Sequence, residues 1–333
     1  MRKLRRGLSV VLAVFCVMFA FASCGKGETS QDGEKKVFNI GVTQYADHPS
    51  LDNCRTGFIE GLKEAGLKEN EDFVIDYQSA QADSKIASQI ADKFASSGKD
   101  LVCGIATPSA QTLYATCLPK NIPVVFNAVS DPVAAGLSKK DGSAMKGITG
   151  VSDALPVEAQ LKLIREILPD AKKIGILYTT GEANSVSTLK IYEELAPKYG
   201  FEIVSKGITK QAEVASALDV VLTSVDCISN MTDNTVVSAL SVLLDKANYK
   251  NIPVFGSEEE QVKNGCLASA GLDYVKLGKQ AGAIAARILK GEDVSSIPFE
   301  TMKESKITVN EKQAEKLGIK ISDSVLKDSE IIK

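Results

Sequence analysis

Short apolar runs and helical patterns alternate along the chain from Phe38 onward. The runs are rich in β-branched residues and cover residues 38–42, 73–77, 101–105 and 122–126. Between the first two runs, Leu51, Cys54, Phe58 and Leu62 recur at helical spacing. Strands that alternate with helices in this way predict a parallel sheet with right-handed crossovers.

The same order begins again at Ile174, which indicates an internal duplication. The second set of predicted strands covers residues 174–178, 201–204, 225–229 and 252–255. Lys-Asn-Ile-Pro-Val occurs at residues 120–124 and again at residues 250–254, and residues 100–107 and 226–232 then align as equivalent strands. We therefore predict an α/β fold of two duplicated, Rossmann-like lobes with parallel sheets. The predicted first lobe comprises residues 37–148 and about 275–300, and the second comprises residues 149–274 and about 301–333.

The duplication predicts a ligand cleft with a hinge. Ligands of open parallel sheets bind outside the carboxyl ends of the strands, so two such lobes that face each other form a cleft. The segments expected to form it are residues 43–50, 106–109 and 127–131 in the first lobe and residues 179–185, 232–235 and 256–260 in the second. Residues 147–156 and 270–274 carry Gly, Pro and Asp where the chain should bend between the lobes.

The N-terminal residues have the layout of an export signal. Four basic residues precede an almost unbroken apolar run over residues 8–22, which is shorter than a usual membrane-spanning helix. The run ends at Phe-Ala-Ser-Cys, which resembles the lipobox of bacterial lipoproteins. The resemblance implies that Cys24 takes the lipid and becomes the mature N-terminus, with residues 1–23 as the signal peptide. Phe21 departs from the aliphatic residue usual there, so simple secretion and a retained anchor helix are the alternatives. Residues 24–36 are polar and predict a flexible tether.

Composition excludes several functional classes. The chain has 333 residues, 44% of them hydrophobic, which is enough for a large core, and a net charge of -3 favours no nucleic-acid partner. Seven cysteines occur, without a Cys-x-x-Cys pair and with a single histidine, so neither a metal nor another cofactor is expected. Cys103 and Cys227 lie in apolar runs and are expected to be buried.

No motif for catalysis is present. Gly-x-Ser-x-Gly, His-Glu-x-x-His, P-loop and Gly-x-Gly-x-x-Gly patterns are absent, and one histidine leaves little for acid–base chemistry, so we predict no enzyme activity. A DNA-binding regulator with the same core would carry a basic helix-turn-helix where this chain carries an export signal.

The motifs together resemble a known family. HPSLD, GFIEGLKEAG, IATPSAQ, FNAVSDPVAAGL, TDNTVVSA and GLDYVKLGKQAG, spread over residues 38–320, are similar to type I substrate-binding lipoproteins of ABC importers, in the branch for tryptophan and other aromatic amino acids. The resemblance implies a monomeric receptor tethered by lipid to the extracytoplasmic face of the membrane. It would close on a free amino acid and deliver it to an ABC permease and its ATPase. The alternatives are a sensory lipoprotein for a membrane signalling partner, or a binding protein for a different small ligand.

The segment Thr107-Pro108-Ser109 follows a predicted strand and begins a predicted helix. Thr107 could cap that helix, with Pro108 in the first turn. The free N–H groups of a helix N-terminus also favour a carboxylate, to which the Ser109 hydroxyl could donate. The resemblance implies that this segment faces the ligand, so we expect a carboxylate site here.

The equivalent segment of the second lobe presents an acid. Asp233, followed by Asn234 and Thr235, could cap its helix or pair with the ammonium group of an amino acid. Asp131, after Ser130, is a second candidate for the ammonium group and could instead form an ordinary turn before proline.

Five more residues belong to the expected site, and they are Gln44, Tyr45, His48, Asn184 and Ser185. Tyr45 and His48 could stack on an aromatic ligand from the loop after the first strand, which also contains Gln44. Asn184 and Ser185 could add polar contacts from the second lobe or simply start a helix. Residues 258–260, three consecutive glutamates, are expected to be a solvated charge run with one member facing the cleft at most.

Overall fold

The structure is a computed structural model, and it describes residues 36–333. The predicted signal peptide, Cys24 and nearly all of the predicted tether therefore lie outside the described residues. Within residues 36–333, no helix has the length and apolar content needed to cross a membrane.

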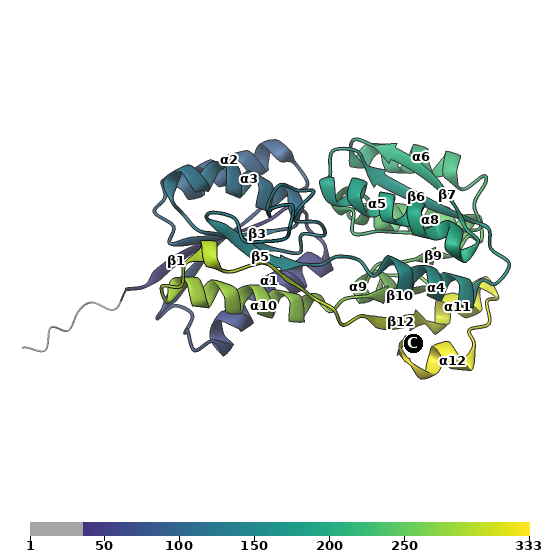
Figure 1. The fold of residues 1–333 in the computed structure, drawn as a ribbon. Coiled ribbons are helices and arrows are strands. Elements are labelled where there is room, and N and C mark those ends of the chain that lie inside the picture. The colour runs from purple at the N-terminus through teal and green to yellow at the C-terminus, as the bar shows by residue number, and fades with distance from the viewer. Residues whose placement is uncertain (1–35) are drawn as a thin grey trace, which may run out of the picture. The chain divides into compact units, whose positions relative to one another are not determined.

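Lobe 1 is built on a six-stranded parallel sheet with the order β11-β5-β4-β3-β1-β2. Helices α2 and α3 cover one face and helices α1 and α10 cover the other (Figure 1). The elements are β1 (Phe38–Gln44), α1 (Pro49–Glu64), β2 (Phe73–Ser79), α2 (Ser84–Ser96), β3 (Leu101–Ile105), α3 (Thr107–Cys117), η1 (Leu118–Lys120), β4 (Val124–Asn127), β5 (Ile148–Ser152), α10 (Tyr274–Leu289), η4 (Val294–Ser296) and β11 (Glu300–Thr301).

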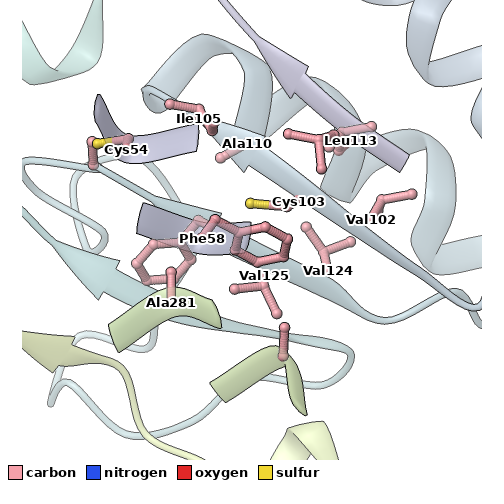
Figure 2. Close-up of a cluster of buried hydrophobic side chains, with 14 of the residues drawn as sticks. Cys54, Phe58, Val102, Cys103, Ile105, Ala110, Leu113, Val124, Val125 and Ala281 are labelled. Carbon is pink, nitrogen blue, oxygen red and sulfur yellow. The ribbon is translucent and has the colours of Figure 1, made fainter. Parts of the chain in front are cut away.

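The core of lobe 1 lies between its sheet and its helices. All five residues of β3 are buried, as expected for a central parallel strand with both faces covered. Figure 2 shows Phe58 of α1 and Ala281 of α10 packed beside Cys103, Val124 and Val125 of the sheet. Cys103 is fully buried and unpaired, and so is Cys227 in lobe 2, which confirms the prediction made for these two residues.

Helices α1 and α10 approach closely because glycines line their contact. A Cβ atom on Gly57 would lie 2.1 Å from the Val275 carbonyl oxygen, and one on Gly282 would lie 2.2 Å from the Phe58 carbonyl oxygen. The contact therefore has no space for any larger side chain. It fixes α10, which is late in the sequence, against α1, which is early.

Lobe 2 is built on a seven-stranded sheet with the order β13-β12-β10-β9-β8-β6-β7. One apolar cluster includes α4 and α5 and the other includes α6 and α8, so both faces of the sheet are covered. The elements are α4 (Val157–Ile167), β6 (Lys173–Thr179), α5 (Ala183–Leu195), η2 (Ala196–Tyr199), β7 (Glu202–Ile208), η3 (Gln211–Glu213), α6 (Val214–Val221), β8 (Cys227–Ser229), α7 (Asn234–Val237), α8 (Leu240–Tyr249), β9 (Val254–Phe255), α9 (Glu259–Lys263), β10 (Ala268–Gly271), β12 (Lys306–Asn310), α11 (Glu311–Leu317), α12 (Asp323–Lys327) and β13 (Ser329–Ile332).

The duplicated α/β fold is confirmed. The order β2-β1-β3-β4-β5 of lobe 1 repeats as β7-β6-β8-β9-β10 in lobe 2. Asn121 and Asn251 of the repeated pentapeptide occupy the same left-handed conformation, with φ of 55° and 54°. The repeat therefore marks equivalent turns that lead into β4 and β9, because asparagine tolerates this conformation better than most residues.

The structure corrects three details of the sequence prediction. The strands expected at residues 122–126 and 252–255 begin at Val124 and Val254, because Pro123 and Pro253 have no N–H to donate to a ladder. Residues 147–156 were assigned to the hinge, but residues 148–152 form the buried strand β5, and β10 likewise takes in part of residues 270–274. The sheet of lobe 2 is not purely parallel, since β12 pairs antiparallel with β10.

The chain passes between the lobes three times. The crossings follow β5, β10 and β11, and they lead to α4, α10 and β12 (Figure 1). Asp153 lies in the first crossing and Tyr274 directly after the second. The Tyr274 hydroxyl donates a hydrogen bond of 2.7 Å to Asp153, so two crossings are joined directly.

Candidate ligand-binding site

A cavity lies between the lobes and takes its wall from both of them. It is narrow in this structure, with a cavity volume of about 20 Å³. Lobe 1 contributes His48, Ser50, Leu51, Ala128 and Ser130, and the crossings contribute Asp153 and Tyr274. Lobe 2 contributes Asn184, Thr232, Asn234, Val237, Glu258 and Gln261.

The wall agrees with the expected cleft segments in part. Five of the six segments contribute residues, and residues 106–109 do not. Of the individual site residues predicted from the sequence, His48, Ser130, Asn184 and Asn234 line the cavity. The others do not line it, and they are Gln44, Tyr45, Thr107, Ser109, Asp131, Ser185, Asp233 and Thr235.

Two lining carboxylates have no basic partner. Asp153 is 3% exposed and accepts hydrogen bonds from the Ser130 hydroxyl at 3.0 Å and the Tyr274 hydroxyl at 2.7 Å. Glu258 is 2% exposed and accepts from the backbone N–H groups of Glu260 and Gln261 at the start of α9. Burial raises the pKa of Asp153, and it raises the pKa of Glu258 to about 7.

Glu258 is the one member of the charge run at residues 258–260 that lines the cavity, which the sequence analysis allowed for. Its carboxylate turns back onto its own helix as an N-cap, which removes it from water. Its neighbours Glu259 and Glu260 do face solvent and pair with Lys263. Three consecutive glutamates therefore have two different environments, with one carboxylate buried in the cavity wall and two paired with a lysine.

Asp233 is a helix cap and not a wall of the cavity. Its carboxylate accepts from the Val236 N–H at 2.8 Å, from the Thr179 N–H at 2.5 Å and from the Thr179 hydroxyl at 2.8 Å. Asp233 is fully buried, and these bonds tie the start of α7 to the end of β6. Of the two interpretations offered by the sequence, the structure agrees with the cap.

Glu182 holds the same helix start from a second direction. It accepts hydrogen bonds from the backbone N–H groups of Asn234 and Thr235, from the Asn234 amide and from the Thr235 hydroxyl. Burial, together with the neighbouring Asp233 charge, raises the pKa of Glu182 to about 7. Asn234 and Thr235 are thus positioned by Glu182, which the sequence analysis did not select.

Asp131 forms the turn that was its alternative interpretation. One carboxylate oxygen accepts from the Ala134 N–H at 2.9 Å, and the other accepts from the Ser187 hydroxyl of lobe 2. Asp131 therefore joins the lobes at the rim of the cleft. Ser130 and Thr232 form a second contact between the lobes, with 3.3 Å between their hydroxyl oxygens.

The start of α3 differs from the prediction. Ala106, with φ of 74°, is the N-cap residue, so Thr107 is the first helical residue and its side chain caps nothing. The Thr107 and Ser109 hydroxyls are buried and have no hydrogen-bond partner. The predicted cap is therefore wrong, and the predicted carboxylate contact at this helix stays a prediction.

His48 lies at the boundary between the lobes. Both ring nitrogens are buried without a well-aligned hydrogen bond, and the Asn234 side chain lies beside the ring. Burial lowers the pKa of His48 to about 4, while the nearby Asp52 and Asp47 oppose that shift. The imidazole is therefore neutral at pH 7.

Gln44 and Tyr45 do not line the cavity, and their side chains form hydrogen bonds within lobe 1. Gln44 donates from its amide to the Ala46 carbonyl at 2.9 Å and to Asp52 at 3.1 Å. The Tyr45 hydroxyl donates to the Ala82 carbonyl at 3.4 Å, and burial raises the Tyr45 pKa to about 12. In the part of the chain that the structure describes, no group of His, Cys, Asp and Glu could hold a metal ion.

Several lining residues were missed in the sequence analysis. Asp153 and Tyr274 fall in or beside the predicted hinge, where Gly, Pro and Asp were taken as signs of bending alone. Glu258 was not singled out within its charge run, and Gln261 follows the predicted cleft segment by one residue. Thr232 lies inside a predicted cleft segment, but the sequence analysis selected its charged neighbour Asp233 and not Thr232.

Comparisons with known proteins agree on one family. The family model for ABC transporter substrate binding protein matches residues 39–333. A tyrosine-binding protein of Clostridioides difficile (strain R20291) is 38% identical over 318 residues, 93% of this chain and 92% of that protein. A structure of an ABC domain from Streptococcus pneumonia in complex with L-Trp is 33% identical, with a TM-score of 0.86, and covers 89% of this chain and 100% of its own. The ligand-free, open structure of a substrate-binding protein with adhesive properties from Clostridium difficile is 39% identical, with a TM-score of 0.67, and covers 89% and 99%.

Proposed function

The chain belongs to the ABC transporter substrate-binding protein family, and from this premise we propose that it is a solute receptor for a free aromatic amino acid. The observation that carries the proposal is the cavity between the lobes, whose polar groups come from lobe 1, lobe 2 and the crossings together. A ligand there contacts every part that must move on closure. Binding and closure are therefore linked.

The two similar structures support a closed arrangement of the lobes in this chain. The open, ligand-free structure has the higher identity, 39% against 33%, yet its TM-score is 0.67 against 0.86 for the complex with L-Trp. Two hydroxyl contacts between the lobes, Ser130 with Thr232 and Ser187 with Asp131, agree with a closed cleft. The aromatic ligands of the relatives, tyrosine and L-Trp, support the same class of ligand here.

The ammonium group of the ligand would bind Asp153 and Glu258 instead of Asp233. A buried carboxylate without a cation costs several kcal/mol, and a bound ammonium group offsets that cost. Both acids line the cavity and have only neutral donors, whereas the oxygens of Asp233 are occupied by backbone and hydroxyl donors. His48, Ser130, Asn184 and Asn234 complete the proposed contacts.

The absence of tryptophan from the chain allows a direct assay. Excitation at the red edge of indole absorption excites L-Trp and not the protein, so a change in L-Trp emission on mixing reports binding. Saturating ligand at 100 times Kd should stabilise the fold by about 2.7 kcal/mol. Mass spectrometry of small molecules extracted from the purified protein would identify the natural ligand. If no aromatic amino acid changes the unfolding temperature and none is extracted, the proposal is wrong.

Placement outside the cytoplasmic membrane through a lipid on Cys24 is part of the same proposal. It rests on the basic residues, the apolar run and the cysteine that follows it in the sequence. The proposal also includes delivery to a permease and its ATPase, a monomeric state and a lack of catalysis, and the family match supports the transporter context. Replacing Cys24 with alanine should release the protein from the membrane fraction, and a variant that stays membrane-bound would refute lipid anchoring.

A further inference from the structure

The charges around the cavity favour a cation more than a zwitterion. Asp153 and Glu258 are lining residues, and no Lys or Arg within residues 36–333 lines the cavity. Among the described residues no ion pair involves either acid or the nearby Glu182 and Asp233, all four of which are at most 3% exposed. A ligand carboxylate would therefore approach several buried acids without any basic side chain to receive it.

An outer groove adjoins the cavity and is also lined by acidic side chains. It shares His48, Ser50 and Glu258 with the cavity and has a volume of about 230 Å³. Asp47 and Glu260 add acidic groups to its wall, and again no Lys or Arg in the described part of the chain lines it. Lys263 does pair with Glu260, but from outside the groove. A concave surface with one sign of charge attracts ligands of the opposite sign and repels a carboxylate.

The hydrogen-bond donors of the cavity wall are largely committed to protein acceptors. The Ser130 and Tyr274 hydroxyls donate to Asp153. Amide protons of three further lining side chains are also used, those of Asn184 on the Thr232 carbonyl, of Asn234 on Glu182, and of Gln261 on the Ser257 hydroxyl. The Asn184 carbonyl oxygen, by contrast, is buried with no partner. Apart from the one N–H of the neutral His48 ring, the wall therefore offers mainly acceptors, which suit an ammonium group better than a carboxylate.

Two of the helix starts that lobe 2 brings to the cavity, those of α7 and α9, are capped by acids. Glu182 and Asp233 take the N–H groups at the start of α7, and Glu258 takes those at the start of α9. Such N–H groups are the usual backbone site for an anion. At the starts of α7 and α9 these N–H groups are therefore already bound by acids of the protein.

We propose that the cavity also binds aromatic monoamines that lack a carboxylate, with the ammonium group between Asp153 and Glu258. The inference rests on the proposed function for the location of the ligand and its aromatic character. It goes beyond that function in the class of ligand, because the carboxylate of the amino acid contributes little to recognition. The apolar side of the cavity, with Leu51, Val237 and Tyr274, accommodates the ring in either case.

A matched series of ligands tests the proposal by calorimetry on the purified protein. Tyrosine and tryptophan are compared with tyramine and tryptamine, which lack only the carboxylate, and with the corresponding aryl-propionates, which lack only the amine. We expect each amine to bind within about tenfold of its parent amino acid, and each propionate to bind at least about a hundredfold more weakly, because the two acids are then left without a cation.

The outcomes separate the two claims. If the amino acids bind and the amines do not, the inference is overturned and the proposed function stands. If the amines bind and the amino acids do not, the inference is supported and the amino-acid receptor is refuted. If neither class binds, both are refuted.

Charge-removing variants locate the ammonium group. Glu258→Gln and Asp153→Asn keep the shape of the side chains and should weaken tyramine binding by tenfold or more on the same charge argument. Glu259→Gln is the matched control, because Glu259 is adjacent in sequence but pairs with Lys263 outside the cavity. Equal amine affinity in the Glu258 and Glu259 variants, both with wild-type unfolding temperatures, would overturn the assignment.

Discussion

The single histidine makes closure of the cleft measurable by pH. In the closed structure burial lowers the pKa of His48 to about 4, whereas an exposed imidazole titrates near 6.5. The neutral ring therefore favours closure at neutral pH, and this contribution is complete above pH 6.5. It decreases as the pH falls from 6.5 toward 4, because the open form takes up a proton that the closed form does not.

The size of the effect follows from the two pKa values. Between pH 7.5 and pH 5.5 the open form gains about 1.3 kcal/mol relative to the closed form, which corresponds to about a tenfold loss of ligand affinity. Two acids act in the opposite direction, since the pKa values of Glu182 and Glu258 are each raised to about 7 in the closed form. The contribution of these two acids is common to the wild type and to His48→Gln, so the difference between the two proteins reports the histidine alone.

Two measurements isolate the histidine. Protein labelled on histidine nitrogen, expressed without a polyhistidine tag, gives one imidazole to follow by NMR with saturating ligand. We expect a ring pKa well below 6, and affinity that falls about tenfold more between pH 7.5 and 5.5 in the wild type than in His48→Gln. A ring pKa near 6.5 in the saturated protein would refute the reasoning, because His48 would then be solvated in the closed state.

Three further predictions concern the fold. Asp233→Ala should lower the free energy of unfolding by about 2–4 kcal/mol in urea denaturation, because it leaves buried donors of Thr179 and Val236 without an acceptor; an unchanged midpoint would contradict the role of Asp233 as a buried cap. Gly282→Ala should destabilise the protein by about 1–3 kcal/mol through overpacking against the Phe58 carbonyl, whereas Gly181→Ala, at a site with open space, should have a much smaller effect; equal effects would argue against the close contact of α1 and α10. The five cysteines within residues 36–333 should resist a thiol reagent at pH 8 and react in guanidinium chloride, since all are buried and burial raises the pKa of each; rapid reaction of the folded protein would show that a thiol is accessible.

The layout of the site was predictable where backbone geometry places it. The carboxyl ends of parallel strands meet at one edge of each sheet, so the cleft segments could be derived from the order of strands alone. His48, Ser130, Asn184 and Asn234 were found in this way, and all of them line the cavity.

The direction of each side chain was not predictable. Asp233 and Glu258 both cap short helices. The sequence analysis left Asp233 between a cap and a cleft contact, and it could not say which of residues 258–260, if any, faces the cleft. In the structure Asp233 is withdrawn behind the wall and Glu258 lies in it. The difference depends on neighbours distant in the sequence, such as Thr179 for Asp233 and the facing His48 loop for Glu258.

By itself, the sequence determined the duplicated α/β lobes, their strand order and the cleft between them, because local hydrophobic period and turn residues act over a few positions. Only the tertiary structure decided which acids remain without partners in the cavity. Hydrogen-bond donors for a buried carboxylate come from segments up to 121 residues away, as Tyr274 shows for Asp153. The number of hydrogen-bond donors that tertiary packing places around a buried acid decides whether that acid can still bind a ligand.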